Sequence, residues 1–548
     1  MKQFIARFED QIQGTLSGFD RVVFRGSLRR LAHSQGMKMY LIQNGILCKQ
    51  YQDHVKRVSQ ELKEASLEPF RREQLPIRHI YDPRTDKDEL ARAMATERGI
   101  SQGNVCALTA MELSPTFQYE KTTMAVRWRP NLVIYHYQID PQFGWCHARI
   151  QTWFPFYVHV CMNGREWLAR RLDQAGIRYC RQQNTFPWVE DCPRAQELFD
   201  EQLRVDWNRS LQPFAERLNP LHAEIFRKFS TQYYWSAFQC EWATDVLFRP
   251  GRLARLEPLL LRHGLLNFSS ADVLRFLGKY VRLNGSVPDW IAGEVATSLK
   301  SRVVGDRLNH WIQGNSLKCY GKAHTPVGDV FRVETMTSNV SIFRTYRPKE
   351  GGPEDRLAWR QMRLGVADLH RRSEVSQKAN NRYLDAFAAL DDTTRLEELI
   401  RPLEQPCRFA GRGVRALRPF QTDDHALLKA VHRGEFAING FRNRDLRRLL
   451  YPGSETLPER ERRRCSAAVS RKIRMLRADG LIQKVPKTHR YQVSPAGRLA
   501  ISAVLTTCEA SLSLLNGRGV QRIWRIVIQR LAAYRRGRIY GAQAIYAN

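Results

Sequence analysis

The sequence predicts an α+β protein of several domains, with a mixed sheet and helical segments followed by a C-terminal winged helix. Alternating strand-like runs occur at residues 17–30, 131–140 and 146–163. Helical periodicity recurs between and after these runs. Residues 423–508 follow the order helix, helix, helix, hairpin, helix. The length of 548 residues suits about three or four domains.

Composition shifts divide the chain into predicted regions. Two Pro/Gly-containing stretches at residues 346–356 and 401–419 read as linkers, and no repeat of fixed period is visible. The regions are an N-terminal α/β region (1–125), a central α+β domain (126–350), a helical segment with a basic linker (351–420), a winged helix-turn-helix (421–510) and a basic tail (511–548).

The elements follow from local patterns. "SGFDRVVFRGSLRR" begins with a strand, and helical pattern continues to about residue 100. Two strands flank the turn "PQFGW" at residues 141–145. A helix then begins at Asn163 as N-cap, with Glu166 three residues later and Gly176 as its stop. We expect residues 195–285 to be mainly helical and residues 315–335 to form a hairpin.

The charge balance indicates a polyanionic partner. Lys plus Arg number 87 against 55 Asp plus Glu, which gives a formal charge of +32. Nucleic acid is the first candidate, DNA before RNA, and a membrane surface is the second. Eleven dispersed cysteines without a CxxC pair argue against a zinc cluster or a disulfide framework and fit a reducing cytoplasm. The sequence contains no apolar run of 18 residues, so we expect no integral membrane segment. The N-terminus does not resemble a secretion signal.

The winged helix carries the clearest binding pattern. Residues 425–498 hold 18 Lys/Arg against 6 Asp/Glu. The predicted third helix, residues 465–480, places Ala468, Val469, Ile473 and Leu476 on an apolar face. Its other residues would face a major groove, and the wing tip would lie along phosphates. The predicted nucleic-acid contacts are Ser466, Ser470, Arg471, Lys472, Arg474, Lys487 and Arg490. The alternative is a winged helix that contacts protein.

Two further observations concern this C-terminal region. "LRADGLIQKVPKTHRYQVSPAGRLA" resembles the third helix and wing of MarR-like winged-helix proteins. The tail after residue 515 contains seven arginines and no acid. It suits a nucleic-acid docking helix, a dimer helix or a membrane-surface helix.

The predicted hairpin gathers candidate chemistry. With a loop at 323–329, Lys318 pairs with Glu334, Tyr320 with Arg332 and Lys322 with Val330. Side chains alternate along a strand, so all of these except Val330 form one polar face. Nearby cations would favour the Tyr320 phenolate as a nucleophile, with Glu334 on a metal and the remaining cations on phosphate. The alternative is a solvent-facing set of cross-strand charge pairs.

Two resemblances extend this interpretation. Residues 316–334, with the pattern S-x-K-x-Y-x-K and then R-x-E, resemble Rep_trans-type rolling-circle replication initiators. That resemblance implies a metal-dependent tyrosine nicking domain, although Gly321 stands where the family has Asp. "FDRVVFRGSLR", "NGREWLARRL" and "NSLKCYGK" resemble blocks of a bacterial protein family without an established activity, over most of the chain.

Other acids and histidines are candidate metal ligands. "FQCEWATDVLF" is predicted as helix, so Glu241 and Asp245 would share a face and hold Mg²⁺ or Mn²⁺. The alternative for Glu241 and Asp245 is a polar stripe beside an aromatic core. Asp20 and Asp140 would complete a carboxylate cluster with this pair. The strand histidines suit either a metal site or core and surface positions; they are His136, His147 and His159.

These patterns predict a cytoplasmic nucleic-acid-binding protein of a mobile-element or plasmid type. The winged helix would choose the site, and the central domain would grip or nick DNA with Tyr320 and Glu334. Such nicking would need Mg²⁺ or Mn²⁺. The alternative is a non-enzymatic DNA- or RNA-binding regulator or ribonucleoprotein component. No GxxxxGK[ST] motif supports an ATP motor.

Overall fold

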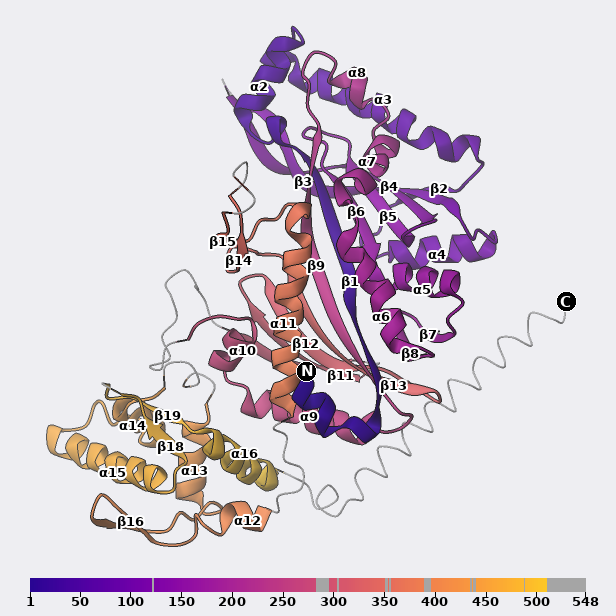
Figure 1. Cartoon of the computed structure of the whole chain (residues 1–548). Coiled ribbons are helices and arrows are strands. Elements are labelled where there is room, and N and C mark those ends of the chain that lie inside the picture. Colours follow the sequence, from indigo (N-terminus) through magenta and orange to yellow (C-terminus); the bar gives the residue numbers. More distant parts are fainter. Residues whose placement is uncertain are drawn as a thin grey trace, which may run out of the picture. The chain divides into compact units, whose positions relative to one another are not determined.

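The computed structural model describes residues 1–120, 123–281, 295–302, 305–349, 353, 356–388, 396–433, 436, 440–486 and 488–509. It is an α+β protein with two compact units (Figure 1). Unit 1 comprises Met1–Leu265, Val273–Lys279 and Pro288–Leu390. Unit 2 comprises Leu266–Asp272, Tyr280–Val287 and Asp391–Asn548.

Unit 1 is built on an 11-stranded sheet with the order β10-β11-β12-β13-β9-β1-β6-β5-β4-β3-β2. Neighbouring strands are antiparallel except β2 and β3, which are parallel. The strands are β1 (Ile12–Leu28), β2 (Ile77–Ile80), β3 (Gly103–Glu120), β4 (Thr123–Asp140), β5 (Gly144–Gln151), β6 (Val158–Asn163), β9 (Tyr233–Phe248), β10 (Ala296–Arg302), β11 (Gly305–Ile312), β12 (Asn315–Thr325) and β13 (Gly328–Thr337).

The described sheet contains one order of elements twice. In the first half, β1 is followed by helices with the short strand β2 among them and then by β3–β6, and β6 returns to pair with β1. In the second half, β9 is followed by helices and then by β10–β13, and β13 returns to pair with β9. The two long strands β1 and β9 pair with each other and join the halves.

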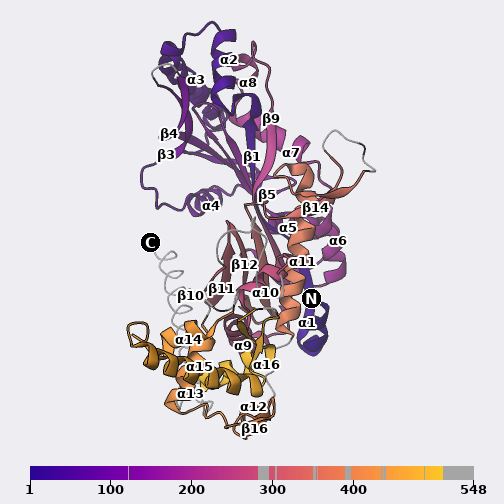
Figure 2. The same cartoon turned by 90° about the vertical axis from the view of Figure 1, so that its left-hand side faces the viewer.

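Helices and two small hairpins complete unit 1 (Figure 2). The hairpins are β7 (Tyr179–Gln182) with β8 (Thr185–Val189), and β14 (Arg344–Arg347) with β15 (Ala358–Gln361). The helices are α1 (Lys2–Arg7), α2 (Ser34–Gln43), α3 (Tyr51–Arg72), α4 (Lys87–Glu97), α5 (Gly164–Ala175), α6 (Cys192–Asp200), α7 (Trp207–Leu218), α8 (His222–Ile225) and α11 (Leu369–Phe387). Two more, α9 (Leu253–Asn267) and α10 (Ser270–Phe276), include residues of both units.

Buried side chains from both layers hold the helices on the sheet. Phe24 of β1 lies against Trp207 of α7, with ring centroids 4.7 Å apart. Asn380 of α11 accepts a 2.6 Å hydrogen bond from the Thr335 hydroxyl of β13 and donates to the Trp242 carbonyl of β9. Because side chains alternate along β13, the other odd-numbered residues of this strand face α11 as Thr335 does. The even-numbered residues of β13 face the opposite side of the sheet.

Several sequence predictions about unit 1 are confirmed. The predicted strands overlap β1, β4, β5 and β6, although the run predicted at 146–163 is interrupted at residues 152–157 between β5 and β6. The Asn163 side chain caps α5 by accepting from the Arg165 amide, and Gly176 ends that helix at φ 67°. This left-handed conformation favours glycine because it has no Cβ.

Other predictions are wrong. Residues 233–248 were expected to be helical, but they form the strand β9. The second half of β9 is buried on both faces, so its sequence lacks the alternation of polar and apolar residues that marks a half-exposed strand. The boundary predicted at 125/126 falls inside the β3–β4 pair, where Gln118 lies opposite Ala125. The boundary predicted at 350/351 is also replaced, because unit 1 continues to Leu390.

Unit 2 shows the predicted order of three helices, a hairpin and a further helix. These elements are α13 (Thr422–Val431), α14 (Asn443–Leu450), α15 (Glu459–Ala478), β18 (Ile482–Lys484), β19 (Tyr491–Val493) and α16 (Pro495–Glu509), preceded by α12 (Leu396–Ile400), β16 (Cys407–Phe409) and β17 (Arg412–Val414). Val414 and Leu417, from the predicted linker, belong to the same buried core as Val469 and Ile473. The linker is therefore part of this unit.

None of the described helices combines the length and apolar character that crossing a bilayer requires.

Candidate nucleic-acid interface and a buried charge network

The hairpin predicted at residues 315–335 is formed by β12 and β13. Lys318 lies opposite Glu334 and Tyr320 opposite Arg332, as the sequence predicts. The predicted loop is wrong, because the strands continue to a two-residue turn between Thr325 and Gly328. A bulge at Lys322 shifts the register, so that Ala323 and not Lys322 lies opposite Val330.

The polar face of this hairpin is buried. The exposed fraction is 8% for Lys318, 9% for Tyr320, 0% for Arg332 and 3% for Glu334. The β7–β8 hairpin supplies cover, because the Asn184 carbonyl accepts a 2.7 Å hydrogen bond from Arg332. The alternative prediction, a set of cross-strand charge pairs that face solvent, is therefore wrong about exposure. The pair of Lys318 with Glu334 is present, but it is buried.

Arg332 is the centre of the network. Its guanidinium donates to both Asp245 carboxylate oxygens, at 2.6 and 2.8 Å, and to Asp20 at 2.9 Å. Arg165, at the start of α5, also lies 3.0 Å from Asp245. Burial alone disfavours charge on Arg332, but Asp20 and Asp245 outweigh it and raise its pKa. Burial would raise the pKa of Asp245, yet Arg332 and Arg165 hold it below its usual range.

The second part of the network surrounds Tyr320. The Lys318 ammonium lies 2.6 Å from Glu334, and the Tyr320 hydroxyl donates to the other Glu334 oxygen at 3.2 Å. Burial and the Glu334 charge raise the pKa of Tyr320, despite the Arg307 guanidinium 4.5 Å from its ring centroid. This environment opposes the phenolate that the sequence interpretation required. Burial and then the nearby Arg332 lower the pKa of Lys322.

The candidate metal ligands of unit 1 are engaged by cations. Glu241 and Asp245 lie on β9, where four residues span about 13 Å, too far to share one ion. Arg21 lies 3.0 Å from Glu241. Lys318 outweighs burial and lowers the pKa of Glu334. Within the described residues, no group of three His, Cys, Asp or Glu is arranged to hold a metal ion. These donors do not fit Mg²⁺ or Mn²⁺.

The remaining acids and histidines have separate surroundings. Asp140 accepts from the amides of Gln142 and Phe143 in the β4–β5 turn, and so does not join Asp20. Burial lowers the pKa of His136 to about 3, and its ring bonds to the Ser66 hydroxyl at 3.1 Å. Burial likewise lowers the pKa values of the other two strand histidines, to about 4 for His147 and about 3 for His159.

His324 joins β12 to α9 on the other side of the hairpin. Its Nε2 lies 2.9 Å from Glu257, and its Nδ1 lies 3.5 Å from Asp329. Burial opposes its charge, but hydrogen bonds to Asp329 and Glu257 raise its pKa to about 9. Glu257 also accepts from the Gly321 amide at 3.0 Å. A Cβ at Gly321 would lie 2.2 Å from that carboxylate, which explains glycine at this position.

In unit 2, α15 presents a basic stripe. Helical spacing puts Arg460, Arg464, Arg471 and Arg474 on one side, around the exposed Ala467. The first three arginines are exposed and Arg474 is half-buried. Among the described residues, none of these four guanidinium groups has an ion-pair partner. Val469, Ile473 and Leu476 pack into the core from the opposite side.

The other predicted contacts in unit 2 have different environments. Asn443 of α14 donates to the Ser466 carbonyl and to the Ser470 hydroxyl, each at 2.9 Å. These two serines therefore bind α14 to α15. Lys472 lies 3.9 Å from Asp424. Arg490 donates to the Gly440 carbonyl at 3.2 Å. Lys487 and the basic tail lie outside the described residues.

Sequence reasoning missed two members of the stripe. The predicted helix began at Cys465, whereas α15 begins at Glu459. Arg460 and Arg464 therefore lay outside the predicted helix. The signal was present in "PERERRRC", because proline and acids are common at the start of a helix.

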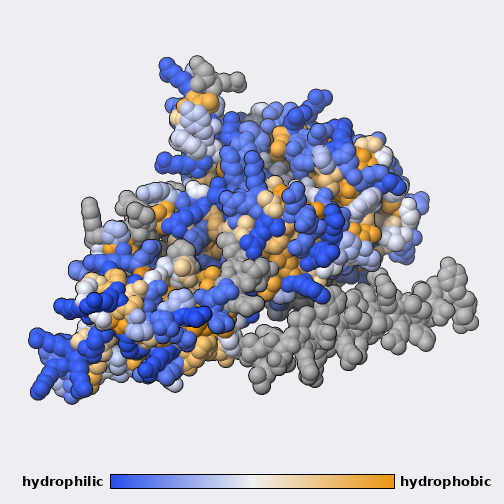
Figure 3. Space-filling model, turned by 60° about the horizontal axis from the view of Figure 1, so that its bottom comes forward, coloured by the Kyte–Doolittle hydropathy of each residue, from blue (hydrophilic) through white to orange (hydrophobic). Residues whose placement is uncertain are grey.

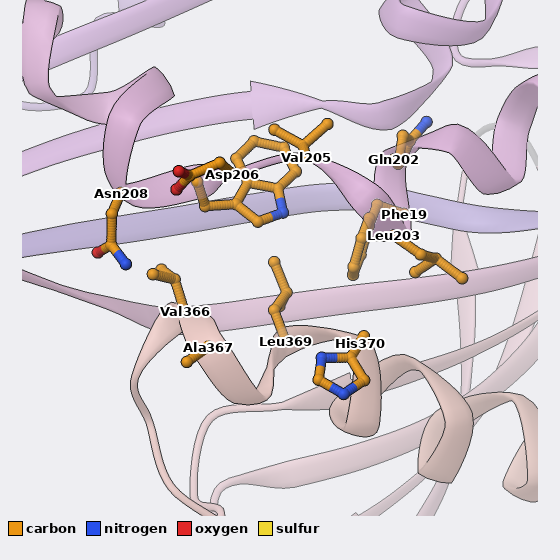
Figure 4. Close-up of a pocket in the computed structure, with 11 residues that line it drawn as sticks. Phe19, Gln202, Leu203, Val205, Asp206, Asn208, Val366, Ala367, Leu369 and His370 are labelled. Carbon is orange, nitrogen blue, oxygen red and sulfur yellow. The ribbon is translucent and has the colours of Figure 1, made fainter. Parts of the chain in front are cut away.

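The described cavities lie away from the charge network. One, of about 130 Å³, lies between α7 and the start of α11 and is lined by residues that include Asp206 and His370 (Figure 4). The other, of about 840 Å³, is lined by α7, α8 and the start of β9, including His222 and Trp235. Neither contains a residue of the β12–β13 hairpin.

Comparisons with known proteins identify no family. No protein-family model matches the chain, and no curated protein matches it. Among solved structures, one weak match is the crystal structure of the di-domain ARO/CYC StfQ from the steffimycin biosynthetic pathway. The sequences are 9% identical, the alignment covers 55% of this chain and 93% of that chain, and the TM-score is 0.12. A likeness this low supports no inference about fold or function.

Proposed function

We propose that the protein binds nucleic acid through the outer face of α15. The observation that carries this proposal is the stripe of four arginines without ion-pair partners among the described residues. Arginine suits phosphate because its planar guanidinium donates two parallel hydrogen bonds. The formal charge of +32 supports the same class of partner, because a polyanion gains from counterion release when it meets such a protein.

The contacts around α15 hold it firmly in unit 2, which suits a recognition helix. The Asn443 side chain bonds α14 to two serines of α15, and Val469 and Ile473 anchor the helix in the core. The stripe is therefore presented with little ordering cost on binding. The face drawn in Figure 3 is mostly hydrophilic, with hydrophobic patches scattered among the charged residues.

Duplex DNA is the proposed ligand. A major groove of B-DNA admits an α-helix, whereas the major groove of A-form RNA is deep and narrow. The small side chain of Ala467, at the centre of the stripe, lets α15 approach base edges closely. We therefore propose that unit 2 recognises the site, as the sequence interpretation also predicts. The mobile-element context remains a prediction.

The non-enzymatic alternative receives support from unit 1. Tyr320 is buried, donates to Glu334 and has a raised pKa. A nucleophile for strand transfer must reach phosphorus and lose its proton. We therefore propose a DNA-binding regulator and not a nicking enzyme.

The test compares affinities for a labelled blunt duplex at one salt concentration. The variant replaces the four stripe arginines with alanine. The control replaces four exposed arginines of unit 1 that are already ion-paired, so both variants lose the same net charge; they are Arg84, Arg127, Arg178 and Arg194. The proposal expects binding to weaken by at least about tenfold in the stripe variant only. Equal binding by the two variants would contradict it.

A further inference from the structure

The β14–β15 hairpin presents two aromatic side chains to solvent. Tyr346 is 54% exposed and Trp359 is 66% exposed. They lie opposite each other across the hairpin, with ring centroids 5.7 Å apart and planes tilted by 54°. Because the rings are tilted and not stacked face to face, each keeps a ring face open. The sequence interpretation treated residues 346–356 as a linker or a domain edge.

The opposite face of the hairpin is anchored to unit 1. Arg347 is 8% exposed and donates to the Gln361 and Pro348 carbonyls. It also lies 3.6 Å from Asp368, whose side chain is fully buried. Thr345 is buried on the same side. The backbone of the hairpin lies at the edge of unit 1 (Figures 1 and 2), and the face that carries Tyr346 and Trp359 is the exposed one.

One cation, Arg344, lies beside the rings on the outer face. Side chains alternate along β14, so the exposed Arg344 shares the outer face with Tyr346. No ion-pair partner of Arg344 is present among the described residues. On the second strand, Arg360 lies opposite Thr345 and so faces the anchored side, and the exposed Arg356 precedes the strand. The sequence between the strands also holds Glu350, Glu354 and Asp355, so the rings and not net charge distinguish the ribbon.

Two exposed aromatic rings beside an arginine match one class of ligand best. Unpaired bases stack on exposed aromatic rings, and guanidinium groups pair with the phosphates between them. A protein-docking surface would need a larger continuous apolar patch, whereas the outer face here alternates rings with Arg344 and Gln361. We propose that the β14–β15 ribbon binds single-stranded or unpaired nucleic acid by stacking bases on Tyr346 and Trp359. This inference rests on the proposed nucleic-acid function.

The experiment measures affinity for a labelled single-stranded oligonucleotide, with the blunt duplex measured in parallel. The variant is Tyr346→Ala/Trp359→Ala in the full chain. The control, Tyr81→Ala/Trp128→Ala, removes the same residue types where they are 87% and 71% exposed. We expect the ribbon variant to bind the single strand about 10- to 100-fold more weakly, with duplex binding and the salt slope unchanged. Tyr346→Phe/Trp359→Phe should retain wild-type binding.

The outcomes separate this inference from the proposed function. If the wild type binds the duplex and the ribbon variant binds the single strand as the wild type does, the ribbon inference is wrong and the α15 proposal stands. If the control variant weakens as much as the ribbon variant, the ribbon inference is also overturned. A ribbon variant that changes only the sedimentation coefficient of the protein would identify a protein contact and overturn it too. If the wild type binds neither polymer, both proposals fail.

Discussion

Replacing Arg332 with methionine tests whether the polar face of the β12–β13 hairpin is structural. The substitution keeps an unbranched side chain but removes a guanidinium that is 0% exposed. It removes three hydrogen bonds to Asp245 and Asp20, at 2.6, 2.8 and 2.9 Å, and one to the Asn184 carbonyl at 2.7 Å. Two carboxylates then remain in the interior with less compensation.

The cost follows from that loss. Removing one partner of a buried ion pair typically destabilises a protein by about 3–5 kcal/mol, because the other charge stays desolvated. Arg165 still contacts Asp245 at 3.0 Å, so we expect the lower part of this range, about 3–4 kcal/mol. A typical domain is stable by about 5–15 kcal/mol, so the change is easily measured.

Urea unfolding followed by tryptophan fluorescence is a suitable assay. All tryptophans except Trp524 belong to unit 1, so the signal reports mainly on that unit. We expect a lower midpoint for Arg332→Met with an unchanged slope. Arg84→Met is the control, because its partner Asp82 is exposed with it, and its midpoint should not move. A wild-type midpoint in Arg332→Met would refute the structural role.

The pH dependence provides a second check on the same variant. The folded-state pKa of Asp245 is depressed, so its pairing adds stability that is present above the unfolded value of about 3.9. That stability is lost as the pH falls through the folded pKa. In the variant, Arg332 no longer offsets the burial of Asp245, so protonation of Asp245 relieves part of the loss. The difference from wild type should therefore narrow from pH 7 toward pH 4.

Three further predictions use the same assays. His324 has a folded pKa of about 9 against about 6.5 unfolded, so its ion pairs add stability that is full below about pH 6.5 and lost as the pH rises through about 9. The urea midpoint of His324→Gln should lie below wild type at pH 6 and approach it at pH 9.5, and a constant difference would count against the pairing. Gly164→Ala should destabilise unit 1 by about 1–3 kcal/mol, because its Cβ would lie 2.0 Å from the Phe19 carbonyl oxygen; an unchanged midpoint would show that α5 can shift. Tyr320→Phe should cost about 0.5–1.5 kcal/mol through the lost Glu334 bond and leave duplex affinity unchanged. A covalent DNA adduct in wild type that disappears in Tyr320→Phe would restore the nicking interpretation.

Local chemistry explains what the sequence could predict. The α5 helix was predicted correctly because Asn163 and Gly176 mark its ends within the helix's own segment. The pairing of Tyr320 with Arg332 was predictable because a hairpin is local and side chains alternate. The charge of unit 2 was likewise visible in the residues themselves.

Contacts between distant segments explain what the sequence could not predict. The polar face of the hairpin is buried by Asn184 and its neighbours, which lie more than a hundred residues away in the chain. The strand β9 was missed because several successive residues are buried on both faces. The repeated order of β1–β6 and β9–β13 leaves no fixed period in the sequence, because the helices and hairpins inserted in each half differ.

The salt dependence of duplex binding tests the central proposal most directly. Each phosphate contact contributes about 0.9 to the slope of log affinity against log salt concentration for B-DNA. If the four arginines of α15 each meet a phosphate, replacing them with alanine should reduce the magnitude of the slope by about 3 to 4. The control lacking Arg84, Arg127, Arg178 and Arg194 should keep the wild-type slope. An equal slope in the wild type and the α15 variant would contradict the account.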